Sequence, residues 1–208
     1  MWTIQTSSKG PTLNVDPVVV RRISGGYFVG VFFGFEPLDE VRNTAADLFE
    51  RRAHELHEYS AKGRLRVLFA SVAEKLKGCH SGTMATVACL WNNGNVTFAI
   101  LGDSMVVGHT RHKWVQSPFH PLNAHCMIGC KNLKPSPAAI PLIRGWNWCD
   151  VVVLTTRGIL NPALEQAYPE DLSVLKSLVN QYESAEGIVD RFRAKENKGA
   201  VVLCRYTK

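Results

Sequence analysis

The sequence has few cysteines and no long apolar run. Six cysteines among 208 residues are too sparse for a small scaffold held together by disulfides, and Cys89 and Cys204 lie in apolar runs typical of core positions. No run approaches the roughly 18–20 apolar residues of a membrane span. The first residues do not combine a basic start with an apolar stretch, as a secretory signal would. We therefore expect an intracellular, cytoplasmic protein without a membrane segment.

Charge is present in ordinary amounts and leans to the basic side. Charged residues make up 20% and apolar residues 46% of the chain, as in globular domains, and the length predicts a single domain, 1–208. The net charge of +6 suits either a solvated surface or a face for an acidic partner. No zinc-finger, helix-turn-helix or RNA-binding signature accompanies it. We expect a protein partner and no nucleic acid.

The spacing of apolar residues predicts separate runs of strands and helices. Helices are expected over 38–59, then up to Gly78 after a break at Gly63, and again over 162–168, 171–182 and 185–192. Asn93-Gly94 is a strong two-residue hairpin signal. Because strands and helices come in separate runs, the order predicts an α+β fold rather than a doubly wound parallel sheet. The predicted strands are 18–23, 27–33, 83–91, 96–101, 105–107, 113–115, 150–154 and 200–204.

Six short stretches follow one another along almost the whole chain, from about Lys9 to Tyr206. They are Asn14-Val15-Asp16, Val31-Phe32-Phe33-Gly34-Phe35, Ser81-Gly82-Thr83-Met84-Ala85, Leu101-Gly102-Asp103-Ser104, Leu154-Thr155-Thr156-Arg157-Gly158-Ile159-Leu160 and Glu196-Asn197-Lys198-Gly199-Ala200-Val201-Val202. In this order the chain resembles the metal-dependent type 2C protein phosphatases, the PPM family. The resemblance implies a four-layer α/β/β/α sandwich of two antiparallel sheets flanked by helix pairs.

The resemblance also implies a chemistry for which this sequence lacks most of the metal ligands. Family aspartates hold two manganese or magnesium ions, which generate a hydroxide that attacks phosphoserine or phosphothreonine. The metal-bridging aspartate corresponds to Phe33, beside Gly34, and a second aspartate corresponds to Arg157. The final Asp-Asn pair aligns with Asn197 and Lys198, or one residue earlier. An aromatic ring offers no lone pair, and a guanidinium keeps its positive charge beside a dication.

Two carboxylates remain at family positions. Asp16, two residues after the retained Asn14, and Asp103 are the residual candidate metal ligands. We expect no cofactor and no catalytic residue, and therefore a catalytically inactive scaffolding or regulatory subunit. The alternative is an atypical metal-dependent serine/threonine phosphatase with residual activity, whose manganese or magnesium would be held by Asp16, Asp103 and Glu196. Arg157 either supplies the missing positive charge to one aspartate or points to solvent.

Two groups of residues are candidates for partner binding. Arg51 and Arg52, with Arg64 on the following helix, could share one basic face; the alternative is a solvated helix face. Trp146 and Trp148 stand at alternate positions of an expected extended segment and would point to the same side. They could anchor a partner or cover the core at a sheet edge.

Overall fold

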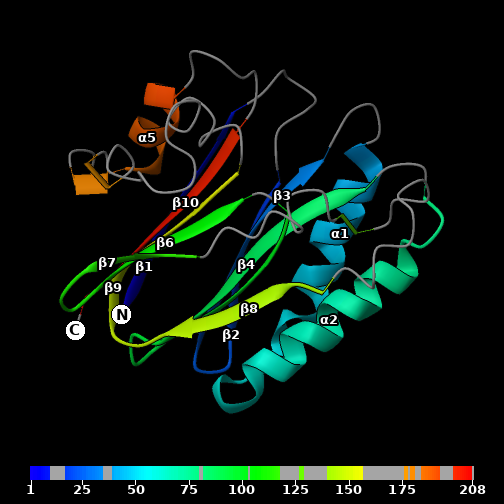
Figure 1. Ribbon diagram of the computed structural model, residues 1–208, viewed down its shortest axis with the longest axis horizontal. Helices are drawn as coiled ribbons and strands as arrows, with labels where there is room; N and C mark the ends of the chain where they lie inside the picture. Colours follow the sequence, from blue (N-terminus) through cyan, green and yellow to red (C-terminus); the bar gives the residue numbers. More distant parts are fainter. Residues whose placement is uncertain are drawn as a thin grey trace.

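The computed structural model describes most of the chain as two five-stranded antiparallel sheets that face each other (Figure 1). We call them the β3 sheet and the β9 sheet. The β3 sheet has the order β2 (Val18–Ile23), β3 (Gly26–Gly34), β4 (Thr83–Trp91), β5 (Val96–Leu101) and β8 (Leu142–Trp146). The β9 sheet has the order β1 (Trp2–Lys9), β10 (Gly199–Tyr206), β9 (Cys149–Thr155), β6 (Met105–Thr110) and β7 (Trp114–Gln116). The described residues are 1–9, 17–34, 39–79, 82–102, 104–117, 127–128, 140–156, 176–177, 179–180, 184–192 and 199–207.

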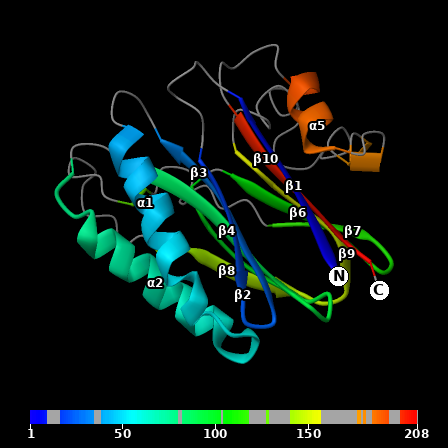
Figure 2. The ribbon, with the colours of Figure 1, turned by 180° about the vertical axis from the view of Figure 1, so that it is seen from behind.

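Helices cover the outer face of each sheet (Figure 2). Helices α1 (Asp39–Arg52) and α2 (Ala61–Lys75) pack on the β3 sheet, and α5 (Ala185–Phe192) packs on the β9 sheet. Three apolar cores fill the layers: one under α1 and α2, one under α5, and one between the sheets. This confirms the predicted α+β sandwich. The helix predicted over 162–168 and most of the one predicted over 171–182 lie outside the described residues.

The alternation of side chains along β3 explains how one strand serves two cores. Phe28 and Phe32 point to α1 and α2, whereas Val29 and Val31 point between the sheets. Phe28 and Phe32 both lie near the ring of Phe49 on α1, with centroids 6.4 and 5.4 Å away. This strand is apolar on both faces because both faces are buried.

The helix predicted over 38–59 is shorter in the structure. The α-helix α1 ends at Arg52, and two single turns of 3-10 helix follow, η1 (Ala53–Glu55) and η2 (Glu58–Ser60). Leu56 adopts an extended conformation with φ −86° and ψ 128°, which an α-helix does not allow. Its side chain is nevertheless buried in the core under α1 and α2. The apolar spacing therefore predicted the burial of this residue correctly, but not the end of the α-helix before it.

Two strands were not predicted. Strand β1 pairs along its whole length with β10, from Trp2 opposite Tyr206 to Lys9 opposite Gly199. Strand β8 pairs with β5, from Trp146 opposite Val96 to Leu142 opposite Ile100. Both are edge strands, which carry polar and half-buried residues and so lack a strong apolar signal. None of the helices among the described residues is long and apolar enough to cross a membrane.

Candidate functional site

One end of the sandwich gathers the strand ends that lead into the six motif stretches. In the β3 sheet, Gly34 at the end of β3 lies opposite Thr83 at the start of β4. In the β9 sheet, Thr155 at the end of β9 lies opposite both Met105 and Val201. The short link from β5 to β6 joins the two sheets at this same end. The chain therefore brings the predicted site elements together.

Phe33 is the site position that the structure describes in most detail. Its place in the alternation of β3 directs its side chain to the same face as Val29 and Val31, between the two sheets. The residue is 6% exposed. Its carbonyl oxygen accepts a hydrogen bond from the Thr83 hydroxyl at 2.9 Å. A buried aromatic ring thus occupies the end of β3, where the resemblance expects a carboxylate bridging two metal ions.

The other positions predicted from the resemblance fall next to described residues but outside them. This holds for Asn14, Asp16, Asp103, Arg157 and Asn197, while Gly34 is described only as the last residue of β3. Among the residues that the structure does describe, no group of three or more His, Cys, Asp or Glu side chains could hold a metal ion. The absence of a metal ion at the two remaining aspartates, Asp16 and Asp103, stays a prediction.

The residues at this end do not fit a pair of hard cations as far as they are described. Divalent manganese and magnesium take oxygen ligands, chiefly carboxylates. Phe33 offers none from its side chain, and its carbonyl oxygen already accepts the Thr83 hydroxyl. The neighbouring Thr156 hydroxyl likewise accepts the Ala200 N–H at 3.0 Å. These contacts link the strand ends to one another, whereas the buried Thr155 hydroxyl beside them has no hydrogen-bond partner among the described residues.

The predicted basic face on α1 and α2 is partly neutralised. Arg52 forms a forked ion pair with Glu55, its Nε and Nη2 lying 2.7 and 2.8 Å from the two carboxylate oxygens. Arg52 also donates to the Ser71 hydroxyl, which ties α1 to α2. The hydrogen bond from Arg52 lowers the pKa of the Glu55 carboxyl, although desolvation opposes the shift. Arg51 and Arg64 are exposed, so they are the members of the set left for a partner.

The two tryptophans do not point to the same side, which corrects the prediction. Trp146 ends β8 and packs on Phe98, with ring centroids 4.5 Å apart. Trp148 lies in the link to β9 with φ 55°, a left-handed conformation in which the alternation of an extended chain is lost. Its ring is 56% exposed and carries the Arg111 guanidinium 4.3 Å above its centroid. Trp146 therefore covers the core at a sheet edge, and Trp148 is the exposed one.

Three of the four described cysteines are buried in the core and offer no reactive thiolate there. Burial raises the pKa of Cys149 to about 12, with a smaller contribution from Asp150. Burial also raises the pKa values of Cys89 and Cys204 far above the ordinary range. A thiol that stays protonated is a poor nucleophile and a poor metal ligand. These three act as small apolar residues, as predicted for Cys89 and Cys204.

Solved structures show which known proteins share this architecture. The chain matches serine/threonine phosphatase Stp1 from Staphylococcus aureus with a TM-score of 0.75 and 15% identity, over 100% of this chain and 96% of that one. It matches the PP2C phosphatase domain of SpoIIE from Bacillus subtilis with a TM-score of 0.72 and 11% identity, over 99% of this chain and 63% of that one.

A third match comes from a different context. A structure from work on the bacterial stressosome, a modular system adapted to control secondary messenger signaling, has a TM-score of 0.67 and 19% identity, over 99% of this chain and 100% of that one. No protein-family model matches the sequence, and no curated protein matches it. At these identities the matches establish the fold, which is that of the PP2C-type phosphatases, as predicted.

Proposed function

We propose that this chain is a degenerate member of the PPM family, catalytically inactive, that acts by binding a protein partner. The observation that carries the proposal is the buried Phe33 at the end of β3. The resemblance assigns a metal-bridging aspartate to this position, and an aromatic ring supplies no ligand while it fills the space. A regulatory or scaffolding subunit needs the fold and its surfaces but not the metals.

The charge at position 157 argues in the same direction. Where the family has an aspartate, this chain has Arg157. Two unit charges of the same sign 4 Å apart repel by about 4 kcal/mol at an effective dielectric constant of 20, and a dication doubles that. A guanidinium at that distance from a metal ion would therefore cost the site roughly 8 kcal/mol in addition to the lost coordination bond. One such exchange would be enough to abolish binding of a metal pair.

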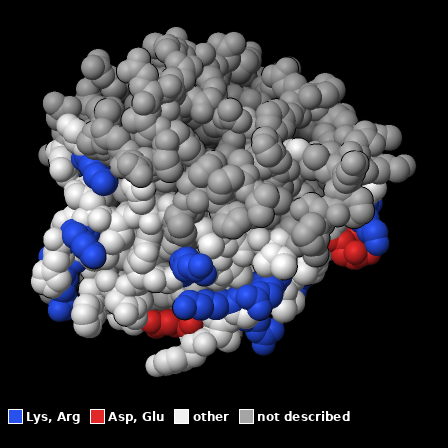
Figure 3. Space-filling view, viewed as in Figure 1, with Lys and Arg blue, Asp and Glu red and all other residues white. Residues whose placement is uncertain are grey.

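A binding role also suits the surface of the molecule. In the described part of the face shown in Figure 3, Lys and Arg form several separate patches and Asp and Glu few, in keeping with the net charge of +6. Exposed Trp148 with Arg111 stacked on it combines two residue types enriched among binding hot spots. The stressosome protein is a precedent for this fold in a regulatory assembly, and it supports the same role here.

The test combines metal binding with catalysis. Thermal unfolding would be followed with increasing manganese or magnesium, beside a phosphatase assay on a phosphothreonine peptide. Ligands that bind only the folded state raise the melting temperature by mass action. We expect no rise and no turnover at millimolar metal. Metal-dependent turnover would contradict the proposal and favour the atypical phosphatase with ligands from Asp16, Asp103 and Glu196.

A designed variant sharpens the test. The double substitution Phe33→Asp and Arg157→Asp returns two carboxylates to the positions that the resemblance assigns to ligands. If the assignment is right, the folded double variant gains a metal-dependent rise in melting temperature that wild type lacks. The matched control is Tyr59→Asp, at a fully exposed aromatic residue, which should gain none. A double variant that folds but ignores metal would contradict the assignment of these two positions.

A further inference from the structure

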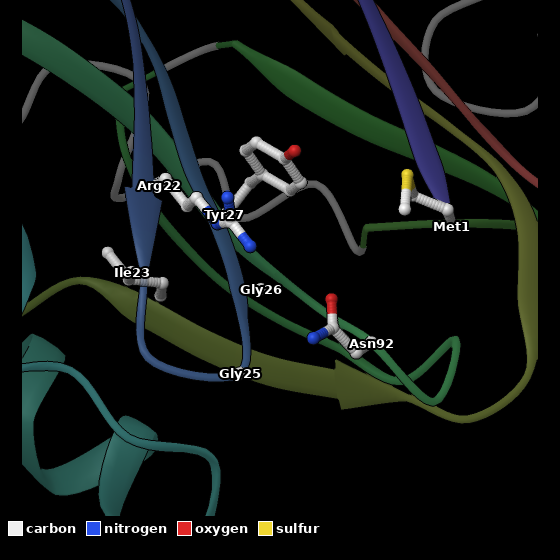
Figure 4. A pocket seen from close by; sticks show the side chains of 7 residues that line it. All are labelled: Met1, Arg22, Ile23, Gly25, Gly26, Tyr27 and Asn92. Atoms are coloured by element: carbon white, nitrogen blue, oxygen red, sulfur yellow. The ribbon is translucent and has the colours of Figure 1, made fainter.

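A cavity of about 290 Å³ lies at the opposite end of β3 from Phe33, beside the turn between β2 and β3 (Figure 4). Its walls come from three parts of the chain: the hairpin, the start of β1, and the turn that follows β4. The cavity is close to the lower limit of small-molecule sites, about 300 Å³, which suits one side chain of a partner. The lining residues are Met1, Arg22, Ile23, Gly25, Gly26, Tyr27 and Asn92.

The cavity combines the apolar residues Met1 and Ile23 with groups that recognise an anion. Arg22 brings a permanent positive charge, and Tyr27 and Asn92 bring a phenol and a carboxamide that can donate hydrogen bonds. The Tyr27 and Asn92 side chains point into the space between the hairpin and the start of β1 (Figure 4). None of the seven lining residues is acidic. A carboxylate is the group that such a lining fits.

Glycine at position 26 lets the β2–β3 hairpin lie close to strand β4 and so shapes the cavity. A β-carbon added there would lie 2.0 Å from the Leu90 carbonyl oxygen, well inside contact distance. The Asn92 N–H also donates to the Gly25 carbonyl oxygen at 2.8 Å. The turn and the chain after β4 are thus held together by the backbone, and the cavity is built before any ligand arrives.

Strand β2, which contributes Arg22 and Ile23 to the cavity, has an open outer edge. Strand β2 pairs with β3 on one side only, and no other strand among the described residues pairs with it. The Phe32 N–H donates to the Pro17 carbonyl oxygen. Because hydrogen-bonded pairs alternate along an antiparallel ladder, the odd-numbered residues from 17 to 23 turn their backbone groups to β3. Val18, Val20 and Arg22 therefore turn theirs outward. Val20 is 41% exposed and Arg22 is exposed too, so this edge is open to solvent.

We propose that the outer edge of β2 binds an extended acidic segment of a protein partner, which adds a strand to the β3 sheet and places a carboxylate against Arg22. An added strand uses the outward backbone groups of Val20 and Arg22. Side chains opposite these two residues lie on one face, two positions apart. The partner motif is then an apolar residue opposite Val20 and an Asp or Glu opposite Arg22.

The cavity is what separates this proposal from simple protection of the edge. Charged residues on edge strands keep sheets from pairing with other chains, and Arg21 and Arg22 could serve that purpose alone. Arg21 points to the helical side, where its Nη1 lies 3.8 Å from Glu50. Arg22 lines the cavity with two further polar side chains and without an acid. Edge protection needs no such enclosure, whereas recognition of a carboxylate does.

This site gives a place to the protein-binding role of the proposed function, yet it does not rest on the loss of catalysis. It lies at the other end of β3, and its ligand does not touch the metal positions. A phosphatase assay therefore tests the loss of catalysis, and a peptide-binding assay tests the binding site at β2.

The experiment uses the full chain and a designed probe. A fluorescein-labelled peptide with the core Glu-Thr-Val-Thr-Glu places an acid two residues from valine in either strand direction. Its binding would be followed by fluorescence polarisation, and the amide signals of Val20, Arg22, Tyr27 and Asn92 by NMR. We expect saturable binding with shifts at these four amides. A probe with lysine in place of glutamate should bind at least about tenfold more weakly, because it loses the charge-assisted pair with Arg22.

Three variants assign the binding to the site. Arg22→Glu should weaken binding about tenfold or more. Val20→Pro removes an outward N–H without removing a hydrogen bond to β3. This variant should therefore still fold but bind the probe more weakly than wild type. Arg66→Glu, at an exposed arginine on α2, is the matched control and should bind within about twofold of wild type. No saturable binding at millimolar peptide, or equal losses in Arg22→Glu and Arg66→Glu, would overturn the proposal.

Discussion

Replacing Phe33 by alanine measures whether the ring really fills the site between the sheets. The residue is 6% exposed, and its carbonyl oxygen accepts a hydrogen bond from the Thr83 hydroxyl. Removing a buried phenylalanine side chain lowers the free energy of unfolding by about 3–5 kcal/mol, through lost burial and the cavity that remains. Because Phe33 stands at the end of a strand, where the structure can partly collapse, we expect a loss near the lower limit of about 3 kcal/mol.

That loss is large enough to read directly. In a domain of 150–250 residues, each kcal/mol shifts the melting temperature by about 2–4 °C, so the variant should melt about 6–12 °C below wild type. Urea unfolding followed by circular dichroism gives the free energy itself. Tyr59→Ala is the control, because Tyr59 is fully exposed and should change stability by less than about 0.5 kcal/mol.

The same measurement can refute the reasoning behind the proposed function. If Phe33→Ala unfolds within about 1 kcal/mol of wild type, the ring is not packed where the structure has it. Space for metal ions would then remain at the end of β3, and the argument from occupied volume would fail. A loss of the expected size leaves the test of metal binding to the double variant.

Three further outcomes are expected. Arg157→Ala should lower the free energy of unfolding by about 3–5 kcal/mol if this arginine pairs with one of the two remaining aspartates; an unchanged melting temperature would show that it points to solvent. Glu55→Gln should lose at most about 1 kcal/mol at pH 7, since its pair with Arg52 is half-exposed. The folded-state pKa of Glu55 lies below its ordinary 4.5, so the pair stabilises above that value, and the difference between wild type and variant in urea unfolding should vanish as the pH falls well below it; a difference that persisted would contradict the pair. Finally, brief alkylation of the native protein followed by peptide mass spectrometry should label the half-buried Cys79 before the three other described cysteines, and equal labelling would contradict their burial. Those three are Cys89, Cys149 and Cys204.

The sequence predicted those elements whose signal is local. Runs such as 27–33 and 83–91 are apolar on both faces, and the hairpin at Asn93-Gly94 has a turn sequence with one strong geometry; the structure has all of them. Strand β1 carries no such signal, because its partner is β10 at the far end of the chain. Tertiary pairing of this kind cannot be read from a window of neighbouring residues.

The candidate site was predicted in part for the same reason. Phe33 stands at the end of a buried strand, as the motif order indicated. The cavity beside Arg22 was not predicted, since residues 1, 22, 23, 25–27 and 92 come together only in the folded chain. Trp148 was placed on the wrong side because its positive φ depends on the crossing from β8 in one sheet to β9 in the other.

The pairing of β1 with β10 sets the order in which the protein can mature during synthesis. All five strands of the β3 sheet lie between residues 18 and 146, so this sheet can form while the ribosome is still adding the rest. The β9 sheet cannot: its first strand waits for the last one, almost 200 residues later. Long-range pairing of this kind slows folding and leaves unpaired edges exposed to aggregation in the meantime. Strand β1 therefore stays without its strand partner until translation has passed Tyr206, and that interval is when a chaperone would matter most.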